Sequence, residues 1–182
     1  QGRAQVFHDS TDTQIVSLAL SPQGTLYAGT SPKGLLVALT GPGKSEVVMD
    51  FDGHEVKAID FGPGDQTARG QAPGAQETLY CIVNEYASPP DPPKRAGLST
   101  RPGAPADAPK PLKGKGQLWK IAGLTAGRNG KPEKLFEDKS THLFSLTALH
   151  RPAAKGPVAY VGTAADGRVI GVDDTHGVSV VA

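Results

Sequence analysis

The residues of this chain that could do chemistry are few, and they are scattered along its length. The five histidines are His8, His54, His142, His150 and His176. No two of them form the H-x-x-x-H pair of a helical zinc site, and the chain has no G-x-S-x-G nucleophile motif. The single cysteine, Cys81, lies in an apolar run and is interpreted as a small buried residue. These residues predict no catalytic group.

Acidic residues gather in three stretches: HDSTD (8–12), DFDGH (50–54) and EDKSTH (137–142). Asp and Ser are good turn formers, so the stretches can be simple connections between repeating units. Alternatively, their carboxylates form a ring that binds a cation or a basic partner, with Asp9, Asp12 and Asp138 as candidates. Asp50 and Asp52 also resemble the start of a calcium loop, but no Glu follows at the twelfth position. They are retained as candidate calcium ligands, and no other cofactor is predicted.

Composition narrows the class of protein. The 182 residues carry 19 basic and 18 acidic side chains, a net charge of +1, so no basic field is available for nucleic acid. No apolar run approaches the roughly 18 residues that span a bilayer. The chain begins QGRAQVF, without Met or a signal peptide, as expected of a processed protein or a piece of a longer one. The 23 glycines and 16 prolines predict many short elements joined by turns.

One four-segment unit recurs three times along the chain. Its segments, short and rich in Val, Ile, Leu, Tyr and Phe, cover 14–20, 25–30, 35–39 and 46–51, then 55–61, 78–83, 117–123 and 133–138, then 142–149, 158–163, 168–172 and 178–182. Such segments, bounded by Gly, Pro, Asp or Ser, are typical of β-strands. Two sets of residues recur in phase, namely Gly34, Gly116 and Gly167, and Tyr27, Tyr80 and Tyr160.

Four antiparallel strands in each repeat of about 40 residues predict an all-β fold of β-propeller blades. A β-sandwich with strands that look alike by chance is the alternative. The expected organisation is a strand at 4–9 from a preceding blade, followed by blades at 13–52, 53–139 and 140–182. We expect Leu18, Ile59 and Leu146 to occupy equivalent buried positions on the first strands.

The stretch VSLALSPQGTLYAGTSPKGLLVAL (16–39) resembles the repeat of bacterial propellers. Two-component-regulator-type sensor propellers, WD40-like and quinoprotein-like propellers carry this pattern. The resemblance covers most of the chain except 62–76 and 85–114, and it implies a bacterial, soluble and extracytoplasmic protein. The Gly-His and Trp-Asp landmarks of true WD40 repeats do not recur in the three units: Gly-His occurs once, at 53–54, and Trp-Asp does not occur.

Two insertions interrupt the second unit, at 62–76 and at 85–114. The longer one holds eight of the 16 prolines and is expected to be an extended arm. Connections in an antiparallel blade alternate between its two ends. The arm should therefore emerge at the same end as the three acidic stretches, and residues 62–76 should emerge at the opposite end. The basic residues Lys94, Arg95 and Arg101 of the arm are candidate partner contacts. Deleting 87–112 should leave the fold intact and weaken assembly or partner binding.

Three blades and one strand do not close a ring, so sheet edges and apolar faces should remain open for another chain. We therefore expect part of a larger propeller that does not behave as a compact monomer. The expected function is a non-catalytic module for protein–protein interaction or assembly scaffolding. Two alternatives stay open: a sensory ligand-binding propeller, and a lactonase- or quinoprotein-like enzyme whose site lies in blades not present here.

Overall fold

The computed structural model describes residues 6–10, 12, 14–62, 76–87, 114–149 and 156–181. Most of the two insertions, and with it Lys94, Arg95 and Arg101, therefore lies outside the described residues. Within the described ranges the chain is all β and contains no helix, so none that could cross a membrane.

The twelve strands are β1 (Gln14–Leu20), β2 (Leu26–Ser31), β3 (Leu35–Gly41), β4 (Lys44–Asp50), β5 (Glu55–Phe61), β6 (Glu77–Tyr86), β7 (Gly114–Leu124), β8 (Lys131–Asp138), β9 (Leu143–Ala148), β10 (Ala159–Thr163), β11 (Val169–Val172) and β12 (Val178–Val180). They form three four-stranded antiparallel sheets in the order of the chain: sheet 1 (β1–β4), sheet 2 (β5–β8) and sheet 3 (β9–β12). Each of the twelve segments in the predicted repeat contributes one strand. None of the three sheets closes on itself.

The ladders between the first and second strands have the same register in all three sheets. Tyr27, Tyr80 and Tyr160 each stand on the second strand, opposite Ala19, Asp60 and Thr147 of the first strand. Each first strand also carries a register shift at the same place. Position by position, the three sheets are therefore built on one plan, and equivalent residues can be compared directly.

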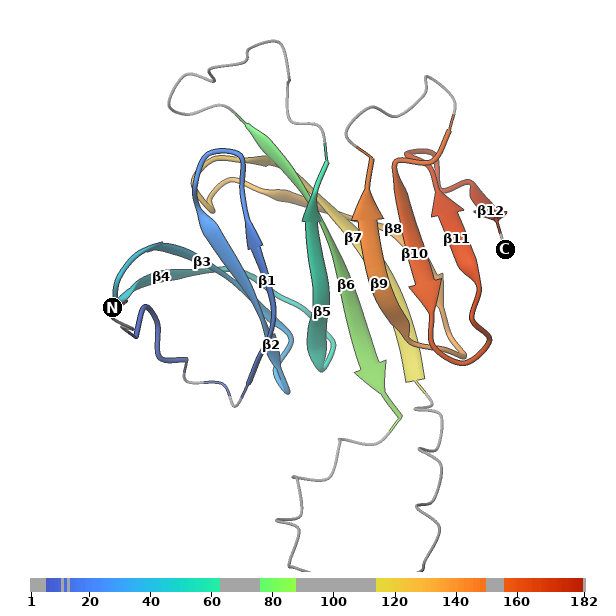
Figure 1. The fold of residues 1–182 in the computed structure, drawn as a ribbon, viewed down its shortest axis with the longest axis horizontal. Coiled ribbons are helices and arrows are strands. Elements are labelled where there is room, and N and C mark those ends of the chain that lie inside the picture. The colour runs from blue at the N-terminus through green and yellow to red at the C-terminus, as the bar shows by residue number, and fades with distance from the viewer. Residues whose placement is uncertain are drawn as a thin grey trace, which may run out of the picture.

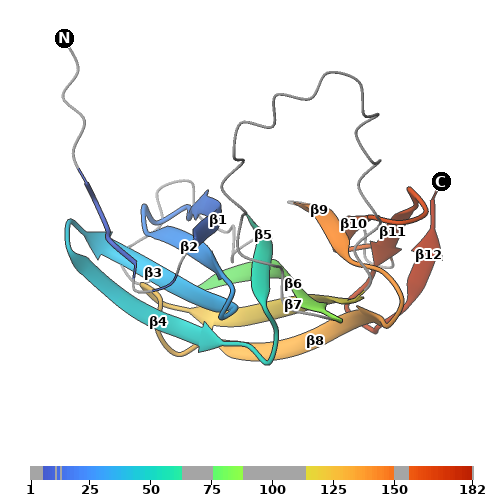
Figure 2. The ribbon, with the colours of Figure 1, turned by 90° about the horizontal axis from the view of Figure 1, so that it is seen from below.

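The sheets pack against one another through their first strands. Strand β5 lies against β1 and β2, and β9 lies against β5 and β6. Figure 2 shows the three sheets along an arc, with β1, β5 and β9 on its inner side and β4 and β8 on its outer side. One apolar core, which includes Tyr27, Leu36 and Phe61, lies between sheets 1 and 2, and a second, which includes Ile82 and Leu143, lies between sheets 2 and 3.

A glycine permits the close approach of sheet 2 to sheet 1. A Cβ placed on Gly29 of β2 would collide with the Ser17 Oγ atom and with the Val56 backbone oxygen. The Ser17 hydroxyl donates a hydrogen bond of 2.7 Å to that same oxygen. Since no side chain occupies this space, β5 can lie directly on β1 and β2.

Two expectations from the sequence are wrong within the described residues. The segment 6–10 is not a strand, and its Phe7 oxygen accepts one backbone hydrogen bond, from Gly43. A strand needs a run of such bonds, which this segment lacks. Leu18, expected to be buried, is 61% exposed, because no sheet covers β1 as sheet 1 covers β5. Its equivalents Ile59 and Leu146 are half-buried.

Candidate functional site

The joints between sheets meet the base of the long insertion at one end of the molecule, which we call the joint end. Figure 1 places the start of β5 on the same side as the end of β6 and the start of β7. The contacts agree, because the Tyr86 amide donates to His54 Nδ1 at 3.0 Å, and the ring of His142 lies 3.2 Å from the Glu85 oxygen. The predicted placement of the arm beside the joints is confirmed for the residues at its base.

A buried polar cluster at the joint end is centred on Asn84 of β6. The Asn84 amide nitrogen donates at 3.0 Å to Glu55 Oε1 and at 3.0 Å to the Leu143 oxygen. The Leu143 amide donates back to Asn84 Oδ1 at 3.1 Å. Asn84 is fully buried. Its side chain bonds both the backbone oxygen and the backbone amide of Leu143, and these two bonds hold the start of β9 against sheet 2. The sequence analysis missed this role, since nothing local marks a strand Asn as a link to a residue 59 positions later.

Aromatic rings complete the cluster. The Tyr86 and His142 rings lie edge to face with centroids 4.9 Å apart, and His142 is fully buried. Burial and the hydrogen bond to Glu55 raise the pKa of Tyr86 well above its ordinary value, so its phenol stays protonated. The cluster therefore gathers hydrogen-bonding and aromatic side chains around the Glu55 carboxylate, which also lies 3.9 Å from the Lys57 ammonium, an arrangement that positions strands. It contains no activated nucleophile.

The acidic candidates take up different roles. Asp12 is buried and accepts a hydrogen bond from the Lys33 amide at 3.2 Å, and Asp138 accepts bonds from the Ser140 and Thr141 amides. Asp138 thus holds the connection between sheets 2 and 3, whereas Asp12 reaches the turn between β2 and β3. Asp9, Asp50 and Asp52 are exposed.

The calcium hypothesis for Asp50 and Asp52 gains no further ligand from the structure. Among the described residues, no group of three or more His, Cys, Asp or Glu side chains is arranged to hold a metal ion. Burial raises the pKa of the Cys81 thiol, which is fully buried and therefore stays protonated.

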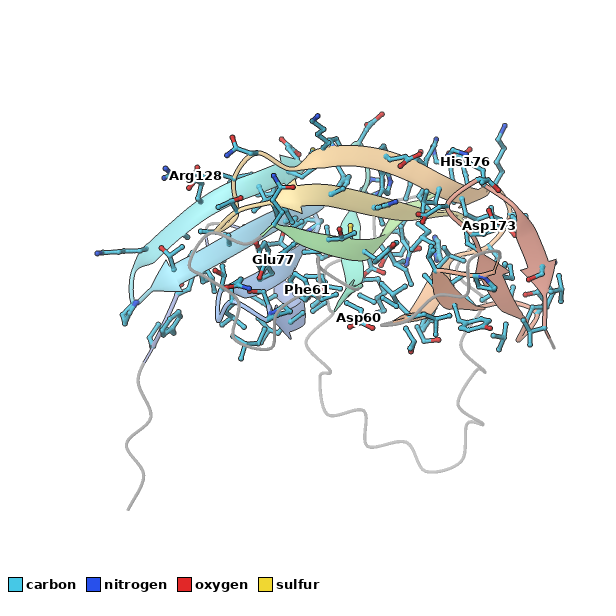
Figure 3. All side chains as sticks on the ribbon, turned by 90° about the horizontal axis from the view of Figure 1, so that it is seen from above. Asp60, Phe61, Glu77, Arg128, Asp173 and His176 are labelled. Atoms are coloured by element: carbon cyan, nitrogen blue, oxygen red, sulfur yellow. The ribbon has the colours of Figure 1, made fainter. Side chains whose placement is uncertain are left out.

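The opposite end of the molecule carries the described flanks of the shorter insertion, as predicted. There, the buried Glu77 carboxylate accepts hydrogen bonds from the Gln23 amide at 3.1 Å and from the Tyr27 hydroxyl at 3.4 Å (Figure 3). A pocket nearby is lined by Gln76, Ala122, Gly123, Asn129 and Lys131. The polar groups of this lining are the side-chain amides of Gln76 and Asn129 and the ammonium of Lys131. The Glu77 carboxylate instead binds the Gln23 amide in the turn that joins β1 and β2.

Polar side-chain contacts along the outer strands join each sheet to the next. Glu46 of β4 lies 2.8 Å from Arg128, which is in the turn before β8, and Glu133 of β8 lies 3.6 Å from His176, which is in the turn before β12. Figure 3 shows both turns at the outer side of the sheets. Glu46 and Glu133 occupy equivalent positions, opposite Ala38 and Lys120 of the third strands. The sequence analysis did not identify these pairs.

The two ends of the arc expose unlike surfaces. At one end, Ile15, Leu18 and Leu20 of β1 are 41%, 61% and 66% exposed. We call these three residues the β1 face. At the other end, Ser145 and Thr147 of β9 are exposed beside Tyr160 and Gly162 of β10. We call these four residues the β9–β10 face.

No family model, curated protein or solved structure matches the chain. The packing of the three sheets and their open faces therefore carry the functional argument.

Proposed function

We propose that the chain is a segment of a β-propeller and serves as a non-catalytic module that binds or assembles proteins. Three features support the propeller assignment. Each sheet is a four-stranded antiparallel meander, each first strand lies on the inner side of the arc, and each sheet packs on the next through that first strand.

The observation that carries the binding function is the β1 face. Positions equivalent to Ile15, Leu18 and Leu20 are Val56, Ile59 and Phe61 in sheet 2, which pack in the core between sheets 1 and 2. Complete burial of one such side chain stabilises a complex by about 1.5–3 kcal/mol. Three exposed side chains of this kind on one strand form an apolar surface suited to another polypeptide.

A photo-crosslinking amino acid at position 18 tests this function in the cells that make the protein. Position 131 on β8 is the matched control, because Lys131 is exposed but lies on neither end of the arc. We expect position 18 to crosslink to polypeptide well above position 131. Mass spectrometry of the products then identifies the polypeptide.

Equal, low crosslinking at positions 18 and 131 would overturn the proposed function. Crosslinking of position 18 to any polypeptide supports it, whether that polypeptide is a second copy of this chain or a different protein. The identity of the product bears on the next proposal alone.

A further inference from the structure

The β1 face and the β9–β10 face match each other as the interacting surfaces of sheets 1 and 2 do. We propose that two copies of this chain associate head to tail, with β1 of each copy packed on β9 and β10 of the other. The proposal rests on the proposed function and names its partner, a second copy of the chain.

The contact between sheets 1 and 2 supplies the template. In that contact β5 lies on β1 and β2, with Val56 placed over Gly29 and its oxygen bound by the Ser17 hydroxyl at 2.7 Å. Ser17 and Gly29 are paired across β1 and β2. Because Gly29 has no side chain, the pair leaves a notch in the surface of sheet 1. The first strand of sheet 2 occupies this notch.

Sheet 3 carries the same notch, and it is open. Ser145 and Gly162 are paired across β9 and β10 just as Ser17 and Gly29 are paired across β1 and β2. Tyr160 also repeats Tyr27. Among the described residues, a Cβ placed on Gly162 would meet only the Ser145 side chain within 4 Å, whereas one on Gly29 meets the Val56 backbone.

The β1 face supplies the residues that this notch would receive. By register, Ile15 is the equivalent of Val56, and Leu18 and Leu20 are the equivalents of Ile59 and Phe61. All three are aliphatic and exposed. Docked as in the template, Ile15 would lie over Gly162 of the second copy, and the Ser145 hydroxyl would donate to the Ile15 oxygen.

The curvature of the arc favours a closed ring of two copies over an open filament of many copies. A head-to-tail contact produces either a filament or a ring. Two copies of the three described sheets supply six four-stranded sheets, a number within the range of four to eight blades found in closed propellers. The arc in Figure 2 is open on one side, so a second arc can complete it and cover both faces of both copies.

The test measures the mass in solution by light scattering, for the wild type and three variants. We expect the wild type to have twice the mass of one chain. Leu18→Arg should weaken association more than about tenfold, because it places a charge in an apolar contact. Gly162→Ala should do the same, because its methyl group fills the notch. Val178→Arg is the matched control, since Val178 is half-exposed but lies opposite Val172, on the face of sheet 3 turned toward sheet 2.

Circular dichroism establishes that each variant is folded. Leu18 is exposed, and the exposed Ser145 side chain can turn away from a methyl group on Gly162, so both variants should keep the β spectrum of the wild type. A wild-type monomer at every accessible concentration would overturn the proposal. So would a dimer that Leu18→Arg and Gly162→Ala leave unchanged.

A second experiment tests the geometry. The double variant Ile15→Cys with Ser145→Cys should form disulfides between copies under mild oxidation, and Cys81 is too deeply buried to interfere. A covalent dimer that does not extend further indicates the closed pair. A ladder of larger products indicates an open filament and contradicts closure. A monomeric chain whose position 18 crosslinks to a different protein contradicts self-association but leaves the proposed function standing.

Discussion

At the scale of single residues, polar groups in this protein hold strands and turns in place. Asn84 bonds both backbone groups of Leu143 and one oxygen of Glu55, and Asp138 holds the turn before β9. A buried polar atom that loses its partner costs more than the bond itself stabilised. Buried polar side chains that link two sheets are therefore expected to contribute to stability alongside the apolar cores.

Asn84→Ala should destabilise the fold by about 2–4 kcal/mol, because the Leu143 amide and the buried Glu55 carboxylate lose their partner together. Urea unfolding followed by circular dichroism measures this loss. Ser45→Ala on β4 is the control, since Ser45 is exposed and its variant should unfold with the wild-type midpoint. A change of less than about 0.5 kcal/mol for Asn84→Ala would show that β9 does not depend on this link.

Asp138 should make stability depend on pH in the acid range. Burial alone would raise the pKa of Asp138, but hydrogen bonds from Ser140 and Thr141 and the charge of Arg168 outweigh burial and lower it. A carboxyl with a lowered pKa in the folded state stabilises the protein above its ordinary pKa near 4, and this contribution is lost as the pH falls through the folded-state pKa.

Asp138→Asn should therefore be less stable than the wild type at pH 7, and the difference should shrink as the pH is lowered toward 2. Urea midpoints measured across this range give the comparison. The exposed Ser45→Ala variant provides the control and should run parallel to the wild type. A constant difference between Asp138→Asn and the wild type at all pH values would contradict this account.

At the scale of elements, the first strand of each sheet determines how sheets stack. Gly29 leaves room for β5, and Gly162 leaves the equivalent room on β10 unfilled. The same substitution at these two sites should therefore have different consequences, although both glycines lie in strands at the same position of the repeat.

Gly29→Ala should destabilise the protein by about 1–3 kcal/mol, because its methyl group meets the Val56 backbone, which cannot move without shifting β5. Gly162→Ala is the matched comparison. With both variants also carrying Leu18→Arg, so that association does not contribute, thermal unfolding should show a clear loss for Gly29→Ala and little for Gly162→Ala. Equal losses would show that the space over Gly29 is not what admits sheet 2.

At the scale of the whole molecule, the two open faces and the base of the arm lie in different places. The β1 face and the β9–β10 face lie at the two ends of the arc, whereas the flanks of the arm lie at the joint end, on β6 and β7. Tyr86 and Gly114 are paired at the last position of that ladder. The ends of the arm are thus already adjacent, and the hairpin does not need the residues between them.

Deleting 87–112 and joining Tyr86 to Lys113 through Asn-Gly should leave the unfolding midpoint and the mass in solution unchanged, because a short turn can close the β6–β7 ladder. Binding of a partner other than a second copy should weaken, since the basic residues of the arm are removed. Unfolding by the deletion would contradict the first expectation, and undiminished partner binding would show that the arm is not the interaction element.

The sequence by itself determined the strands and the phase of their repeat. Strand segments are set by local properties, namely β-branched and aromatic residues between turn formers, so the twelve strands and the equivalence of Tyr27, Tyr80 and Tyr160 could be predicted. Alternation along an antiparallel meander likewise placed the two insertions at opposite ends. The sequence also indicated that apolar faces would remain open.

Only the tertiary structure decided which side chains those faces expose and which polar groups meet. Leu18 and Ile59 stand at the same position of the repeat, yet Leu18 is exposed and Ile59 is half-buried, because burial depends on a neighbouring sheet and not on the strand itself. Asn84 finds Leu143 across 59 positions because two sheets pack there. Contacts of this range depend on how separate sheets approach one another, which no local pattern of residues specifies.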